Sequence, residues 1–127
     1  MRLLTILLLC AVAVGCGYGS HSTTPPQPGA TPTISQLNPS GVVAGSQTFT
    51  LEVDGTNFAS NAVINFNNAV ETTTWVSGVK LTASIPGSAI TTAKTVPITV
   101  TNQAVAGGIY GGGTTAVTSQ PMNFTIQ

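Results

Sequence analysis

Hydrophobic and polar residues alternate in short runs from Pro32 to the end of the chain, and turn residues separate these runs. The alternating hydrophobic positions are Phe49, Leu51 and Val53; Ala62, Ile64 and Phe66; Val79, Leu81, Ala83 and Ile85; Val96, Ile98 and Val100; and Met122, Phe124 and Ile126. A period of two places each set on one face of a β-strand. Residues 88–92 are predicted to form one helical turn. Two half-apolar sheets bury their faces against each other, so the pattern predicts an all-β sandwich.

The amino-terminal segment has a different pattern. Met1 and Arg2 form a short positive region, and residues 3–14 are a twelve-residue apolar run in which Thr5 is the one polar residue. Twelve helical residues rise only about 18 Å, which is well short of the ~30 Å hydrocarbon core of a bilayer. Residues 1–15 are therefore predicted to be a secretory signal peptide rather than a transmembrane helix.

Both cysteines of the chain lie at the end of this segment. Ala13-Val14-Gly15-Cys16 resembles the lipobox of bacterial lipoproteins, which implies a diacylglyceryl thioether on Cys16 and a third acyl chain, of the palmitate type, on its amine. Two or more acyl chains hold a protein durably at a membrane. Cys10 is expected to be a small hydrophobe within the removed helix. The alternative is an ordinary secreted protein cleaved after Ala11-Val12-Ala13. The expected location is the cell envelope, at the outer membrane or the periplasmic face.

Residues 16–31 contain the acylated cysteine followed by Gly, Ser, Thr and three prolines, and they are predicted to be a flexible linker. Its reach approaches ~45 Å in the stiff, proline-rich limit. His21 is the only histidine, and it has no Cys, Asp or Glu close by in the sequence. We therefore expect no metal or catalytic role for His21.

Ionisable residues are rare, because Lys and Arg number 3, Asp and Glu number 3, and charged residues make up 5% of the chain. Because so few cations cannot neutralise several phosphates of a nucleic-acid backbone, nucleic acid is not an expected partner. The 42% of hydrophobic residues is typical of a folded chain rather than a disordered one. No cofactor and no metal site are expected.

Six segments resemble the successive strands of an IPT/TIG domain: PTISQLNPSG, FTLEVDGTNF, AVINFN, VKLTASIP, VPITVTN and MNFTIQ. They span residues 32–127. The most specific piece is Gly55-Thr56-Asn57-Phe58, in which we expect Gly55 to accept a positive φ, Asn57 to bond the turn backbone, and Phe58 to enter the core. The resemblance implies an immunoglobulin-like fold and a non-catalytic extracytoplasmic module with a structural or binding role.

The acidic residues do not indicate an active site. Glu52 and Asp54 lie two apart on one predicted strand, so both should face solvent with α-carbons ~7 Å apart. Neighbours on an open strand share one environment, whereas an acid and a base need different pKa values. Glu71 is interpreted in the same way. With the only histidine in the linker, no catalytic residue is assigned and the chain is not expected to be an enzyme.

Residues 103–119 are predicted to be an enlarged loop before the last strand, equivalent to the F-G loop of immunoglobulin-type binders. Its glycine-rich tip at residues 107–113 carries Ile109 and Tyr110, and Tyr among Gly is typical of recognition loops. These two residues are candidate contacts for a protein partner, for example a larger envelope complex. The alternative is a mobile hairpin that binds nothing.

Trp75, the only tryptophan, has the wrong parity for the core of its strand and is predicted to face outward at a sheet edge. An exposed tryptophan can stack on a sugar ring, which makes a carbohydrate-binding module the second function class. The alternative is that Trp75 covers the end of the core. We expect Lys80, Lys94 and Pro97 to protect exposed strand edges in part.

Overall fold

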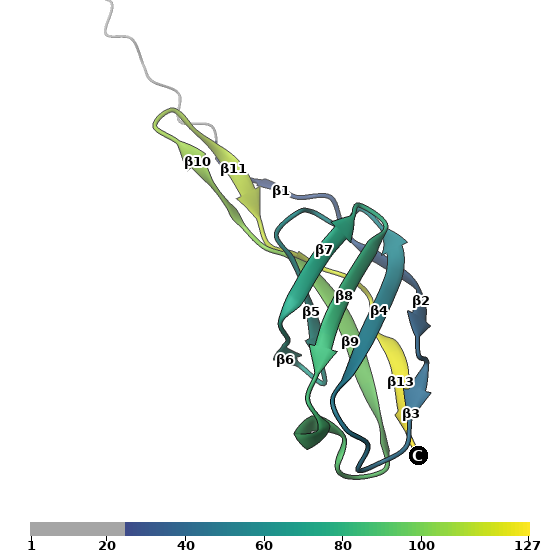
Figure 1. Cartoon of the computed structure of the whole chain (residues 1–127). Helices are drawn as coiled ribbons and strands as arrows, with labels where there is room; N and C mark the ends of the chain where they lie inside the picture. The colour runs from purple at the N-terminus through teal and green to yellow at the C-terminus, as the bar shows by residue number, and fades with distance from the viewer. Residues whose placement is uncertain (1–24) are drawn as a thin grey trace, which may run out of the picture.

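The computed structural model describes residues 25–127, in which two sheets face each other and a hairpin projects from one end (Figure 1). The first sheet has the order β2 (Thr33–Asn38), β4 (Phe49–Thr56), β8 (Lys80–Ile85) and β7 (Thr73–Ser77). The second has the order β3 (Gly41–Val42), β13 (Met122–Ile126), β9 (Lys94–Asn102), β5 (Ala62–Phe66) and β6 (Ala69–Val70), with β12 (Val117–Thr118) also paired to β9. The predicted all-β sandwich is confirmed.

A third, small sheet has the order β1 (Gln27–Pro28), β11 (Gly111–Thr115) and β10 (Val105–Gly108). The predicted helical turn is a short 3-10 helix, η1 (Gly87–Ile90), which buries Ile90. Within residues 25–127 no helix is long and apolar enough to cross a bilayer. The signal peptide and Cys16 lie outside the described residues.

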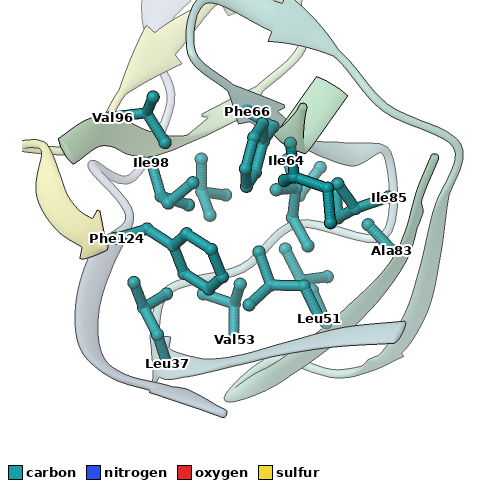
Figure 2. Packing of buried hydrophobic residues seen from close by; sticks show 14 of the residues in the cluster. Leu37, Leu51, Val53, Ile64, Phe66, Ala83, Ile85, Val96, Ile98 and Phe124 are labelled. Atoms are coloured by element: carbon teal, nitrogen blue, oxygen red, sulfur yellow. The ribbon is translucent and has the colours of Figure 1, made fainter. Parts of the chain in front are cut away.

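The alternating hydrophobic positions form the core between the two sheets. Phe124 lies within this core, where its ring is set edge-on to Phe66 at 5.4 Å (Figure 2). The Phe124 ring is also stacked on Phe49, with the ring centroids 5.8 Å apart. Phe49 and Met122 are partly buried and pack against the same cluster. Val79 is the exception, since it is 55% exposed. The chain turns at Gly78 and Val79 before β8 begins at Lys80, so the two-residue period does not extend to Val79.

The Gly55-Thr56-Asn57-Phe58 segment behaves only partly as predicted. Phe58 is buried, as expected. Gly55 does not have a positive φ; instead, a Cβ on Gly55 would overlap the carbonyl oxygen of Thr33 and lie 2.6 Å from Cζ of Phe58. The residue with the left-handed conformation is Asn57, at φ 60°. Glycine is therefore required at position 55 because β2 passes so close to β4, and not because of the turn.

The edges of the sandwich are not protected in the predicted way. Lys80 is in β8, and Lys94 and Pro97 are in β9, and both are inner strands. At the β5 edge, the chain between β6 and β7 supplies partners instead: the Glu71 N–H donates to the Ile64 carbonyl at 2.9 Å, and the Ile64 N–H donates to Thr73 Oγ1 at 2.9 Å. A break in register between Trp75 and Ser77 twists the β7 edge.

Candidate functional site: a glycine hairpin and the hollow at its base

The enlarged loop of residues 103–119 is largely strand in the structure. β10 and β11 pair antiparallel, with Gly108 opposite Gly111, and Ile109 and Tyr110 form the turn between them. Gly111 to Gly113 have φ values of 84°, 85° and 95°, which side chains of L-residues rarely adopt. The glycine run thus has a structural reason, because it gives β11 a conformation that few other residues could take.

The tip of this hairpin is apolar and accessible. Ile109 is 89% exposed and Tyr110 is 68% exposed, and Val105 on β10 is also exposed. No Asp, Glu, Lys or Arg occurs in residues 103–119. The two residues proposed from the sequence as binding contacts therefore stand side by side at the far end of an uncharged projection (Figure 1).

The base of the hairpin is tied to the sandwich. Ser119 donates its N–H to the Val100 carbonyl at 2.8 Å, and its Oγ accepts the Val100 N–H at 3.0 Å. The hydroxyls of Thr101 and Thr118 lie 2.8 Å apart. β12 continues this contact by pairing with the end of β9. These bonds hold the root of the hairpin in register with the second sheet.

The end of the predicted linker also joins the hairpin. Gln27–Pro28 forms β1, which pairs in parallel with Thr114 and Thr115 of β11. The carbonyl of Thr31 accepts a hydrogen bond from Asn57 Nδ2 at 3.2 Å. The Asn57 side chain therefore bonds to the segment before β2 and not, as predicted, to the backbone of its own turn. The flexible linker predicted for residues 16–31 is thus shortened, since the part from Gln27 onward is docked on the domain. The sequence could not show this because β11 lies more than eighty residues away.

Asn102, at the end of β9, connects these parts. Its side chain is 4% exposed, and Nδ2 donates to the carbonyl of Ala30 at 2.9 Å and to that of Asn57 at 2.7 Å. Its Oδ1 accepts the Ala59 N–H at 3.0 Å. Three chain segments thus meet on one buried amide. The sequence analysis placed Asn102 in a segment that resembles the family but assigned it no role. The feature that could have identified it is its position, because Asn102 continues the buried alternation of Val96, Ile98 and Val100 with a polar side chain.

A hollow of about 360 Å³ lies between the hairpin base and the end of the sandwich. Its lining includes Asn61, Gln103, Val105, Thr114 and Thr115, and none of its lining residues is charged. Asn61 donates through Nδ2 to the Gln103 carbonyl at 3.1 Å. Its Oδ1 is buried with no hydrogen-bond partner among the described residues. The hollow therefore offers amides and hydroxyls beside an apolar wall, the usual lining of a site for a neutral polar molecule.

Trp75 does not line this hollow. It lies in the edge strand β7, as predicted, and is 43% exposed. Its indole N–H donates to the carbonyl of Phe58 at 3.2 Å, and Phe58 belongs to the hollow's wall. The structure thus separates the proposed contacts into two groups, with Trp75 on the sandwich and Ile109 and Tyr110 at the hairpin tip.

The carboxylates on the outer face of the first sheet are engaged by a lysine. Lys80 Nζ lies 2.8 Å from Glu52 Oε1 and 3.6 Å from Asp54 Oδ1. The hydrogen bond to Glu52 raises the pKa of Lys80 above its ordinary value, and the charges of Asp54 and Glu52 add to this. The contribution of the raised Lys80 pKa to stability is present at neutral pH and is lost as the pH rises through that pKa. An ion-paired carboxylate on an open sheet face is a structural feature rather than a general acid or base.

Glu71 stands apart from that cluster, and partial burial raises the pKa of its carboxyl group. Within residues 25–127, no three His, Cys, Asp or Glu side chains are grouped so that they could hold a metal ion. His21 lies outside the described residues.

The sandwich with its projecting hairpin belongs to the class of immunoglobulin-like modules that serve in binding or structure. The family model of the IPT/TIG domain matches residues 32–126, which is most of the chain. The chain therefore belongs to the IPT/TIG domain family, whose members are generally non-catalytic modules. No curated protein matches the chain when sequences are compared.

Proposed function

We propose that the chain is a non-catalytic lipoprotein of a bacterial cell envelope, anchored through acyl chains on Cys16, whose IPT/TIG module has a structural or binding role outside the membrane. The observation that carries the proposal is Gly15-Cys16 at the end of the apolar run of residues 3–14. A run too short to span a bilayer, followed at once by Gly-Cys-Gly, is typical of a cleaved and acylated leader.

The described module is compatible with such an anchor. Its first strand, β1, begins at Gln27, about eleven residues after Cys16, so a short segment would separate the lipid from the fold. The module has no cysteine, so its stability does not depend on a disulfide. The module would then act by binding or by a structural role, through its shape and its hydrogen-bonding surfaces, and not by proton transfer.

Replacement of Cys16 by serine tests the anchor. We expect the native chain to be extracted from membranes with an intact mass of residues 16–127 plus three acyl chains, because the thiol and the new amino terminus both carry lipid. The Cys16→Ser variant should leave the membrane fraction, since a hydroxyl cannot accept the thioether-linked lipid. Cys10→Ser is the matched control and should behave as the native chain does.

An unmodified Cys16 thiol in the native chain, or release of the native chain into the medium, would contradict the proposal. Either result would instead support the ordinary secreted protein that is cleaved after Ala13.

A second candidate function is the binding of a neutral glycan. The observation that favours it is the uncharged hollow at the hairpin base, where Gln103, Thr114 and Thr115 offer hydrogen-bonding groups beside Val105. Sugar hydroxyls pair with amides and hydroxyls of this kind. The hollow is about the size of one or two sugar rings.

Trp75 provides the readout for this second function, because its indole is bonded to Phe58 in the wall of the hollow. On titration with maltohexaose, cellohexaose and comparable oligosaccharides, at least one should shift the Trp75 emission. Gln103→Ala should weaken that response, whereas Thr74→Ala, at an exposed position on β7, should not. The absence of a shift with every glycan tested would remove this candidate.

A further inference from the structure

We propose that the hairpin tip formed by Ile109 and Tyr110 rests in the same lipid surface that holds the acyl chains of Cys16, so that the module contacts the membrane at two points. This inference depends on the proposed lipid anchor and adds an orientation to it. Three observations support it: the direction in which the chain leaves β1, the length of the segment before β1, and the chemistry of the tip.

The direction follows from the pairing of β1. Gln27 lies opposite Thr114 and Pro28 lies opposite Thr115, and the two strands are parallel. β11 runs from Gly111 beside the tip to Thr115 at the base. Because parallel strands share one direction, the described residues just before Gln27, Pro25 and Pro26, lie on the side of the tip. From this direction we infer that the anchor lies on the tip side, whereas the carboxyl terminus lies at the far end of the sandwich (Figure 1).

The lengths of the hairpin and of the segment before β1 allow the anchor and the tip to reach the same membrane surface. From Thr114 to Tyr110 the hairpin extends four residues, or about 13 Å at ~3.3 Å per residue. About eleven residues connect Cys16 to Gln27 and can span at most ~36 Å. The segment is thus long enough for the tip to touch the membrane, and short enough to keep the tip close to it. Such tethering makes contact with that surface effectively intramolecular.

The chemistry of the tip suits a lipid surface. Ile109 presents almost its whole side chain to solvent, and burial of such a side chain in an apolar phase is favourable. Tyr110 is of a residue type that is enriched where a membrane meets water. No charged residue in 103–119 would need to be dehydrated. The cations of the described chain lie on the sandwich: Lys80 is paired with Glu52 and Asp54, and Lys94 starts β9 at the opposite end from Asn102.

This charge distribution also identifies the kind of lipid surface. Because residues 103–119 contain no cation and Lys80 is already paired with carboxylates, attraction to anionic headgroups contributes little, so the contact depends on apolar insertion. Zwitterionic vesicles should be sufficient, and the contact should persist when salt is raised.

The test uses the full chain carrying its acyl chains, reconstituted in phosphatidylcholine vesicles that contain brominated acyl chains. In the Tyr110→Trp variant we expect an added emission component that is blue-shifted and quenched by the bromines. Thr92→Trp is the matched control, since Thr92 is exposed near η1 at the other end of the sandwich, and its added emission should remain unquenched. The native chain gives the Trp75 background for both. Adding Ile109→Ser to Tyr110→Trp should reduce the quenching.

Each outcome decides a separate point. A lipidated chain whose Tyr110→Trp emission is no more quenched than that of Thr92→Trp would overturn the two-point contact and leave the lipid anchor standing; a tip that serves a protein partner would give this result, because no partner is present in the vesicles. An intact mass that shows an unmodified Cys16 would overturn the proposed function, and with it the contact. Quenching that is lost at high salt would contradict an apolar contact.

Discussion

Replacing Phe124 by alanine is expected to lower the free energy of unfolding by about 4 kcal/mol, since truncation of a buried Phe typically costs ~3–5 kcal/mol. The side chain is completely buried. Its ring is stacked on Phe49 of the first sheet and set edge-on to Phe66 of the second, so one truncation weakens contacts to both sheets. Figure 2 shows the Phe66 and Phe124 rings in the core. The cavity would open in the middle of the interface between the sheets, where neighbouring strands cannot collapse to fill it.

The measurement is urea unfolding of the full chain, followed by circular dichroism. Thermal unfolding gives a second readout, because for a domain of about this size a decrease of ~1 kcal/mol in the free energy of unfolding lowers the melting temperature by roughly 4–8 °C. Thr125→Ala is the matched control, because Thr125 is the next residue of β13 and faces solvent, and it should change stability by no more than about 0.5 kcal/mol. Equal effects of the two substitutions would show that Phe124 does not hold the sheets together.

Replacing Asn102 by alanine is expected to cost about 3 kcal/mol. The change leaves the carbonyls of Ala30 and Asn57 and the N–H of Ala59 without their partner. A buried group that loses its hydrogen bond costs roughly 1–3 kcal/mol, and water entering the hollow would offset part of the sum. We also expect the amide of Ala59 to exchange with solvent faster than in the native chain, because its acceptor is removed.

Asn65→Ala is the control for this second substitution. Asn65 is in β5, the strand next to β9, and its amide donates to the hydroxyls of Thr99 and Thr101 on the outer face of the sheet. Water can replace that amide, so the expected cost is below about 1 kcal/mol. If Asn102→Ala proved as mild as Asn65→Ala, the buried amide would not be what joins the chain before β2 to the end of β9.

The hydrophobic pattern alone was enough to predict the class of fold. The runs around Leu51, Ile64, Ile98 and Phe124 place one residue in two toward the interior, and strands with such faces have few stable arrangements other than a sandwich. The solvent-facing positions of Glu52 and Asp54 followed from the same period. Burial of Phe58 and an enlarged loop before the last strand were also predicted, from the resemblance to the IPT/TIG domain.

The failures share a physical cause, which is contact between residues far apart in the sequence. Gly55 is required because its neighbouring strand β2 brings the Thr33 carbonyl so close, Lys80 pairs with carboxylates on the neighbouring strand β4, and Gln27–Pro28 becomes a strand only because β11 offers a partner. None of these partners lies within the window over which a local pattern can be interpreted.

The sequence by itself determined the alternation of faces, the scarcity of charge and the presence of the Gly15-Cys16 pair on which the proposed lipid anchor rests, because each is a property of neighbouring residues or of composition. Only the tertiary structure decided that Asn102 joins three segments, that an uncharged hollow forms beside the hairpin, and that the chain before Gln27 approaches from the side of Ile109 and Tyr110. Those features depend on the register and direction of strand pairs, which are set by long-range hydrogen bonding and packing rather than by local preference.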